Sequence, residues 1–199
     1  MRTAVGWAVT AVVGVLTACT STVAGSASSG GPPDLEAALS VQLPGLRPVD
    51  PPPPPWQLCT TAPGTRAPRL DPALGEAVTS GYASEEMTLY VYAWATSAPM
   101  VAEAILGQAE LEAPDCASAP PVDAGPGAGI TRSVDGWTGS GWSGVRIRTE
   151  VSGPDPAVEE TRLVHSDEVV VLVVLDAEGG DPDLRPVDEH LAAVADRLG

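Results

Sequence analysis

The stretch Val169–Leu175, with the sequence VVVLVVL, consists of seven consecutive apolar residues. Successive side chains of a strand point to opposite faces of a sheet, so an uninterrupted apolar run predicts a strand that is covered on both faces. The preceding residues Arg162–Val164 are expected to pair with it through a turn at His165-Ser166-Asp167. We therefore expect Val169–Leu175 to be a central strand of a sheet.

A second strand with two apolar faces is predicted at Met87–Thr96, paired with Glu76–Tyr82 around the turn Ala83–Glu85. One face of Met87–Thr96 is aliphatic and the other is aromatic. The aliphatic residues are Leu89, Val91, Ala93 and Ala95, and the aromatic residues are Tyr90, Tyr92 and Trp94. In Val145–Val151, by contrast, apolar residues alternate with charged ones, which predicts a strand with one face toward solvent.

Apolar residues at helical spacing predict three helices. The first spans Asp34–Leu43 with Asp34 as its N-cap. The second spans Met100–Glu112 and is expected to end at Pro114, and the third occupies Leu184–Leu198. The order helix, two strands, helix, about three strands and helix predicts a single α+β domain with a mostly antiparallel sheet.

Residues 1–18 have the layout of a bacterial secretory signal peptide. Met1–Thr3 carries one positive charge, and Ala4–Leu16 is apolar apart from Thr10. As a helix this apolar segment rises about 20 Å, which is shorter than the hydrocarbon core of a bilayer, about 30 Å. The next residues, Leu16-Thr17-Ala18-Cys19, resemble the bacterial lipobox. In that family the cysteine is diacylated on its thiol, by chains such as palmitate, and becomes the new N-terminus, which implies lipid attachment at Cys19.

Two other interpretations of the N-terminus stay open. Cleavage at Gly25-Ser26-Ala27 would release a soluble secreted protein, and an uncleaved segment would act as a membrane anchor. The short apolar segment disfavours the uncleaved anchor. Two or three acyl chains meet the requirement of two signals for stable anchoring. Lipidation at Cys19 therefore predicts a protein held on the extracytoplasmic face of the cell membrane.

The region after the lipobox cysteine differs in composition from the rest of the chain. Residues 19–33 are mostly Ser, Gly, Ala and Pro, which predicts a flexible tether. The domain is expected at residues 34–199, with a helix and a proline-rich arm at 34–55 and a core at 56–199. The run Pro51–Pro55 predicts a polyproline arm, either a stiff spacer along the domain or a ligand for an aromatic groove.

Cys19, Cys59 and Cys116 are the three cysteines of the chain. If Cys19 carries lipid, an even number remains for an oxidising compartment, which predicts a Cys59–Cys116 disulfide. By the chain-entropy argument such a bridge contributes on the order of 4 kcal/mol. The alternative, a redox or metal pair, requires close cysteine spacing or neighbouring histidines, and the sequence has neither.

The chain is strongly acidic, with 26 acidic and 10 basic residues and a formal net charge of −16. A surface of this sign repels phosphate groups, which argues against nucleic acid and anionic lipid headgroups as partners. The high content of Pro and Gly, 21 of each among 199 residues, is still below that of a wholly disordered chain.

The order of the predicted elements resembles actinobacterial "sensor domain-containing" lipoproteins, which are similar to the extracellular sensor domain of PknH-type kinases. The segments that carry the resemblance are Leu35–Gly45, Cys59, Met87–Thr96, Pro99–Leu111 followed by Cys116, Arg162–Leu175 and the C-terminal amphipathic helix. The resemblance implies a twisted antiparallel sheet flanked by helices, with a cleft for an extracellular ligand. Two features depart from the kinase: its domain has two disulfides where this sequence can form one, and this sequence has no kinase half.

The sequence contains no organised catalytic motif. The segment Gly141–Val145 lacks the last glycine of the GxSxG nucleophile elbow. His165, in a predicted turn, and His190, on the polar side of the last predicted helix, are expected to be solvated. The acidic residues near the start of that helix leave cation binding open, although one of the last two has a simpler role as N-cap. These residues are Asp176, Glu178, Asp181 and Asp183.

Two groups of aromatic residues are candidates for ligand contact, and burial in the core is the alternative for both. The first group, on the predicted strand, consists of Tyr90, Tyr92 and Trp94. The second group, Trp137 and Trp142, lies in the glycine-rich segment Gly136–Gly144, which is predicted to be a loop. An indole offers a large apolar surface with one N–H donor, which suits a glycan or a lipid tail.

We expect a non-enzymatic lipoprotein that acts as a ligand-binding or accessory module of the cell envelope, without cofactor or metal. Its expected partners are the membrane, through the N-terminal lipid, and an extracellular small molecule or envelope protein, but no nucleic acid. One alternative is a structural partner of another envelope protein. The other is a hydrolase that uses carboxylates such as Asp135 or Asp167.

The lipobox interpretation predicts the effect of Cys19→Ser. Without a thiol at residue 19 no diacylglycerol can be attached, so the protein should move from the detergent phase to the aqueous phase in phase partitioning. Cys59→Ser is the matched control and should leave the partitioning unchanged. Equal partitioning of wild type and Cys19→Ser would contradict lipid attachment at this residue.

Overall fold

The computed structural model describes residues 33–55, 57–59, 69–70, 74–119, 127–180 and 182–198. All of them fall within one compact unit, Pro32–Gly199. The predicted signal peptide, the lipobox cysteine and the tether as far as residue 32 lie outside the described residues. No helix among the described residues is long and apolar enough to cross a membrane.

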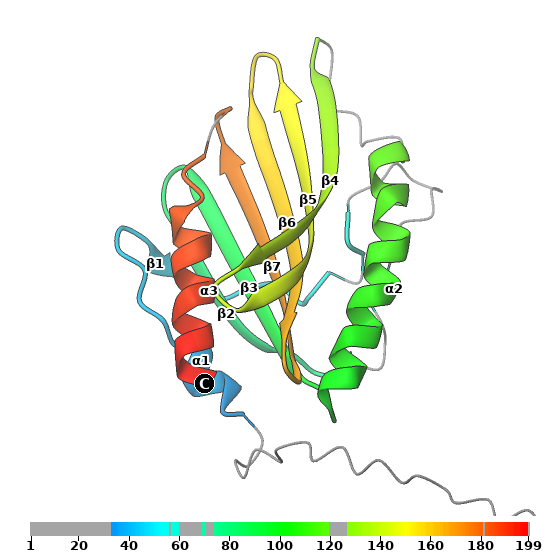
Figure 1. Cartoon of the computed structure of the whole chain (residues 1–199). Helices are drawn as coiled ribbons and strands as arrows, with labels where there is room; N and C mark the ends of the chain where they lie inside the picture. Colours follow the sequence, from blue (N-terminus) through cyan, green and yellow to red (C-terminus); the bar gives the residue numbers. More distant parts are fainter. Residues whose placement is uncertain are drawn as a thin grey trace, which may run out of the picture. The chain divides into compact units, whose positions relative to one another are not determined.

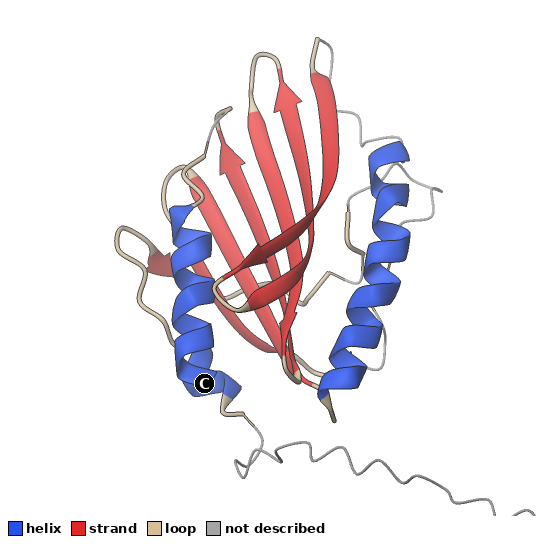
Figure 2. Ribbon diagram, viewed as in Figure 1, coloured by secondary structure: helices blue, strands red, loops and turns tan. Residues whose placement is uncertain are grey.

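Seven strands form one open sheet in which every neighbouring pair is antiparallel (Figures 1 and 2). In chain order they are β1 Arg47–Pro48, β2 Val78–Ala83, β3 Met87–Ala95, β4 Gly129–Gly139, β5 Trp142–Ser152, β6 Ala157–Ser166 and β7 Val169–Glu178. Their order across the sheet is β1-β2-β3-β7-β6-β5-β4. The predicted α+β class with an antiparallel sheet is confirmed.

Strand β7 lies at the centre of the sheet, between β3 and β6, as the apolar run predicts. Val170 and Leu172 belong to the core on one face, whereas Val171 and Val173 belong to the core on the other. Because successive side chains alternate, a strand of this composition requires a cover on both sides of the sheet.

Helices supply the two covers, one on each face of the sheet (Figure 1). Helix α2, Pro99–Ser118, packs against β4, β5, β6 and β7 on one face. On the other face lie α1, Leu35–Leu39, and α3, Arg185–Leu198, which contact each other. The side chain of Asp34 caps α1 by accepting a hydrogen bond from the Ala37 amide at 3.0 Å, as predicted.

The disulfide between Cys59 and Cys116 forms in the core under α2, with the two Cα atoms 6.0 Å apart. Cys116 lies inside α2, because the helix continues through Pro114 to Ser118, and the expected end at Pro114 is wrong. Pro114 has no amide hydrogen, so the Glu110 carbonyl lacks its usual helical donor. Both residues are exposed, so water can satisfy that carbonyl. The buried disulfide holds the final turn to the core.

The glycine-rich segment expected as a loop is instead the hairpin of β4 and β5. Its turn lies at Ser140 and Gly141, with φ angles of 51° and 82°, which favour short polar residues and glycine. Gly144 is required by close packing, because a Cβ there would lie 2.1 Å from the carbonyl oxygen of Leu163. The glycines therefore serve strand pairing and not mobility.

Three polar contacts attach α3 to its neighbours. The indole Nε1 of Trp142 donates to the Leu191 carbonyl at 2.8 Å, and the guanidinium of Arg162 contacts Asp188 at 2.6 Å. Near the end of α3, Arg197 donates to the Ala37 carbonyl of α1 at 2.8 Å. These contacts fix α3 to the β5–β6 part of the sheet and to α1.

The burial of Trp142 predicts a large loss of stability in Trp142→Ala. The substitution leaves a cavity beside α3 and removes the donor to Leu191, so the free energy of unfolding should fall by about 3–5 kcal/mol. Denaturant unfolding measures this change. Trp137→Ala, which removes a half-buried indole from the same hairpin, should cost less, and equal losses in the two variants would contradict the distinction.

His190 is 1 % exposed, not solvated as expected, and its ring packs edge-on against Tyr82 with centroids 5.3 Å apart. Neither ring nitrogen has a hydrogen-bond partner in the described part of the chain. Burial, reinforced by the nearby charge of Arg197, lowers the pKa of His190 from 6.5 to about 4. The imidazole is therefore neutral in the folded protein at neutral pH.

The lowered pKa of His190 predicts acid destabilisation. The full stability is present above pH 6.5, and it declines toward pH 4 because the unfolded chain binds the proton more readily than the folded chain. The loss should reach about 3 kcal/mol. Urea unfolding at pH 7 and pH 5 should show a smaller difference in His190→Leu than in wild type. The same pH dependence in His190→Leu as in wild type would contradict this assignment.

Candidate functional site

The aromatic residues singled out in the sequence do not form an exposed ligand face. Tyr92 and Trp94 are buried in the core on the α2 side of the sheet, and the Trp94 indole donates to the Gly75 carbonyl at 3.3 Å. Burial is the main cause that raises the pKa of Tyr92 to about 12. Trp142 is 2 % exposed, and the expectation that it contacts a ligand is therefore corrected. Tyr90 and Trp137 are half-buried.

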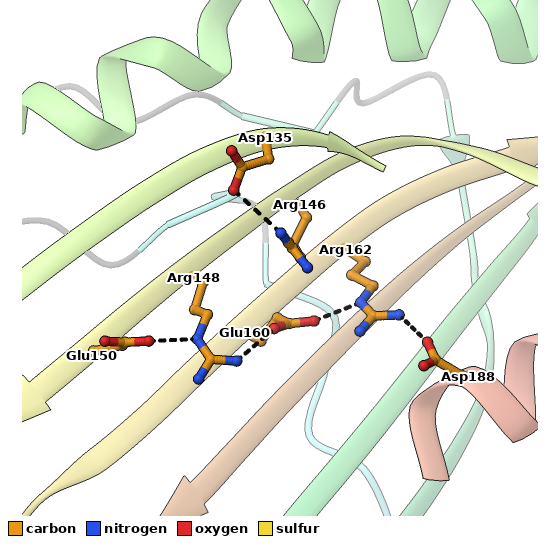
Figure 3. Close-up of polar contacts among 7 residues, drawn as sticks. All are labelled: Asp135, Arg146, Arg148, Glu150, Glu160, Arg162 and Asp188. Atoms are coloured by element: carbon orange, nitrogen blue, oxygen red, sulfur yellow. Dashed lines mark hydrogen bonds and ion pairs between the residues drawn. The ribbon is translucent and has the colours of Figure 1, made fainter. Parts of the chain in front are cut away.

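A group of charged side chains lies instead on the α3 side of the sheet, over β4, β5 and β6 (Figure 3). We call this group the charged face. It consists of Asp135, Arg146, Arg148, Glu150, Glu160 and Arg162. The strand register brings them together, since residues directly opposite each other share a face. Arg146 lies opposite Asp135 on one side and Arg162 on the other, and Arg148 lies opposite Glu160.

The inner part of the charged face is buried and fully paired. Glu160 and Arg162 are 1 % and 2 % exposed, and their side chains are joined at 2.6 Å. Arg162 also contacts Asp188 of α3 at 2.6 Å, and its guanidinium lies 4.8 Å from the centre of the Trp137 ring. Buried charges persist only when they are paired and hydrogen-bonded. This part therefore serves to hold α3 and the β4–β5 hairpin on the sheet.

Arg148 belongs to the outer part, which water reaches. Its Nε donates to Glu150 at 2.7 Å, and its Nη1 contacts Glu160 at 3.4 Å. Burial lowers the pKa of Arg148, but the two carboxylates outweigh it and raise the pKa above its ordinary value. Arg148 is thus a well-neutralised cation.

Arg146 is less well neutralised than its neighbours. Its side chain is 33 % exposed and contacts the exposed carboxylate of Asp135 at 3.4 Å through one terminal nitrogen. Its Nε is buried and has no hydrogen-bond partner among the residues that the structure describes. A second cation, Arg162, lies directly across the strand pair. Arg146 therefore retains donor capacity and positive charge for an additional anion.

The chemistry of this outer part suits a carboxylate or a phosphate. A guanidinium offers a planar set of donors that matches such groups with two parallel hydrogen bonds. Asp135, with half of its side chain exposed, is held at a long distance, and an exposed ion pair of this kind contributes little stability. A ligand anion can therefore replace Asp135 at small cost, beside the half-buried indole of Trp137.

The other candidate side chains do not assemble into a reactive centre. Asp135 pairs with Arg146, whereas Asp167 occupies the β6–β7 turn with a φ of 48°. His165 lies at the end of β6, with its Nε2 at 3.2 Å from the Ser143 hydroxyl.

The acidic group considered for cation binding is not brought together either. Asp183 contacts Arg185 at the start of α3, and Asp181 lies outside the described residues. Burial raises the pKa of Asp176. Across the described segments, no three or more His, Cys, Asp or Glu residues are placed to hold a metal ion.

Sequence reasoning missed the charged face although part of its signal was present. Arg146 and Arg148 alternate with apolar residues and so share one face of a strand. The adjacent residues Glu159 and Glu160 face opposite sides of their strand, but the partners of Glu160 depend on a register that the sequence does not give. The strand that carries Glu160 was predicted to begin at Arg162, but it begins five residues earlier, at Ala157.

No protein-family model and no curated protein matches this chain. Among solved structures, the chain is similar to the extracellular domain of PknH from Mycobacterium tuberculosis. The TM-score is 0.49 at 12 % sequence identity, over 82 % of this chain and 89 % of that chain.

Proposed function

We propose that this protein is a non-enzymatic, lipid-anchored module of the outer face of the cell membrane that binds an anionic ligand on its charged face. The observation that carries the proposal is the environment of Arg146. In an acidic chain, this arginine has a buried donor without a partner and a weak contact to an exposed carboxylate. A ligand with a carboxylate or phosphate group would pair with the exposed end of the guanidinium and replace the weak contact to Asp135.

The proposed location rests on two features of the chain. The lipobox-like residues Leu16–Cys19 support lipid attachment after export. The disulfide Cys59–Cys116 supports an oxidising compartment, because structural disulfides are rare where thiols are kept reduced. Both features fit a domain that faces the outside of the membrane.

The proposed ligand class follows from what surrounds Arg146. The well-paired residues Glu160 and Arg162 hold the backbone beneath it, so the guanidinium is presented from a rigid part of the sheet. Trp137 lies nearby on the same face and offers an apolar surface. An acidic saccharide suits both the guanidinium of Arg146 and the indole of Trp137, because its carboxylate pairs with arginine and its ring packs on an indole.

Arg146→Gln should weaken binding of a carboxylated sugar. Loss of one charge-assisted hydrogen bond corresponds to about 1.5–3 kcal/mol, or roughly a tenfold to hundredfold increase in Kd. The probes are N-acetylmuramic acid and N-acetylglucosamine, which share a ring and differ by the lactyl carboxylate. Titration followed by NMR should place the first probe at Arg146 and show much weaker binding of the second.

Arg185→Gln is the matched control, because it removes the same charge from an exposed arginine outside the charged face. It should leave the affinity unchanged. Equal affinity for the two sugars, or equal weakening in the two variants, would contradict the proposed site. The folding of Arg146→Gln is checked by its melting temperature, which should stay close to that of wild type because the lost pair is exposed.

A further inference from the structure

The large exposed hydrophobic residues of the described chain all lie on α2. Met100 and Leu111 are 76 % and 79 % exposed, and Val101 is 38 % exposed. Isolated apolar residues on a surface need no explanation, but Met100 and Leu111 lie on one side of the helix and form a candidate docking surface. Helix α2 lies on the face of the sheet opposite α3, so this surface is separate from the charged face.

Four residues of α2 fall on one line along its outer side. At about 100° per residue, Met100, Ala104, Gly107 and Leu111 lie within a narrow arc. We call these four residues the outer stripe. The buried residues Ile105, Ala109 and Cys116 lie on the opposite side of the helix, against the sheet. The outer stripe therefore points away from the core, with bulky residues at its two ends and small residues between them.

Packing within the chain does not require a glycine at residue 107. A Cβ at this position would meet no atom within 4 Å. Glycine is the least favourable helix residue after proline, and alanine would be preferred here if the surface faced only water. A glycine between exposed apolar residues instead allows another backbone or a large side chain to approach closely.

The charges beside the outer stripe are all of one sign. Glu103 and Glu110 lie along one edge and Asp115 lies along the other, and all three are exposed. Helix α2 contains no Lys or Arg. An apolar centre with an acidic border complements an apolar seam with a basic border. Two copies of α2 would bring acidic borders together, which disfavours self-association.

We propose that the outer stripe of α2 docks an amphipathic helix of a partner protein, one with an apolar seam flanked by Lys or Arg. Large side chains of the partner pack over Ala104 and Gly107, between Met100 and Leu111. Basic side chains of the partner pair with Glu103, Glu110 and Asp115 at the border. This surface adds a protein partner to the ligand site proposed above and does not depend on it.

The test uses two synthetic helical peptides with the same leucine and alanine seam, one with Lys at the flanking positions and one with Glu. The isotope-labelled full chain is titrated with each peptide, and the shifted backbone resonances are mapped. The Lys peptide should shift residues of α2 and bind more weakly as salt increases. The Glu peptide should bind at least tenfold more weakly.

Three variants locate the contact. Leu111→Ser should weaken binding of the Lys peptide about tenfold, whereas Ala117→Ser, an exposed change on the same helix outside the stripe, should leave binding unchanged. Gly107→Leu should raise the melting temperature by about 2–4 °C, because it improves helix propensity in open space. The same variant should nevertheless weaken peptide binding, which separates a contact effect from a folding effect.

Several outcomes would overturn the proposal. These are equal binding of the two peptides, shifts confined to segments other than α2, or no effect of Leu111→Ser. Self-association in sedimentation that Leu111→Ser abolishes would assign the stripe to a second copy of the chain. Binding of the Cys19→Ser chain to phosphatidylcholine vesicles, again abolished by Leu111→Ser, would assign it to a lipid surface. Loss of peptide binding alone would leave sugar binding at Arg146 untouched.

Discussion

The rest of the structure depends on one constraint: β7 is apolar on both faces and must be shielded from water on both. A single helix cannot shield two faces, so α2 covers one side and α3 with α1 covers the other. The two covers are offset. Helix α2 lies over β4–β7, whereas β4, β5 and β6 carry charged residues on the α3 side. On the α3 side of the sheet, the part formed by β4, β5 and β6 is therefore where a polar ligand can approach.

The boundary between the apolar and the polar half is built from a buried ion pair. Glu160 and Arg162 lie beside the apolar residues of β7, and α3 supplies Asp188 to complete the pairing. Burying such a pair rarely adds net stability over apolar residues of equal volume, but removing one partner leaves an uncompensated charge. The pair thus fixes how α3 sits on the sheet, and it gives the outer arginines a rigid base.

The sequence predicted those parts of the fold that depend on local patterns. The apolar run of β7, the two apolar faces of β3, the Asp34 cap and the pairing of Cys59 with Cys116 all appear in the structure. The errors involve long-range contacts. Trp142 is buried because α3 offers it the Leu191 carbonyl, 49 residues later, and glycines nearby suggested a loop. His190 is buried because Tyr82 packs against it, and Pro114 stays helical because Cys116 is tied to the core. The charged face was missed for the same reason, since it requires the register of three strands.

The contact between α1 and α3 would have a mechanical consequence if the chain is anchored through its N-terminus, as proposed above. Helix α1 begins at Leu35, directly after the predicted tether, and the ends of α1 and α3 lie together (Figure 1). Tension along the tether would reach the domain through α1, whose carbonyl groups are held by Arg197 and by the Tyr82 hydroxyl. These few hydrogen bonds therefore lie between the tether and the sheet along the path of the force. Because α1 precedes the strands along the chain, these contacts would bear the tension before the sheet and the surfaces proposed on it.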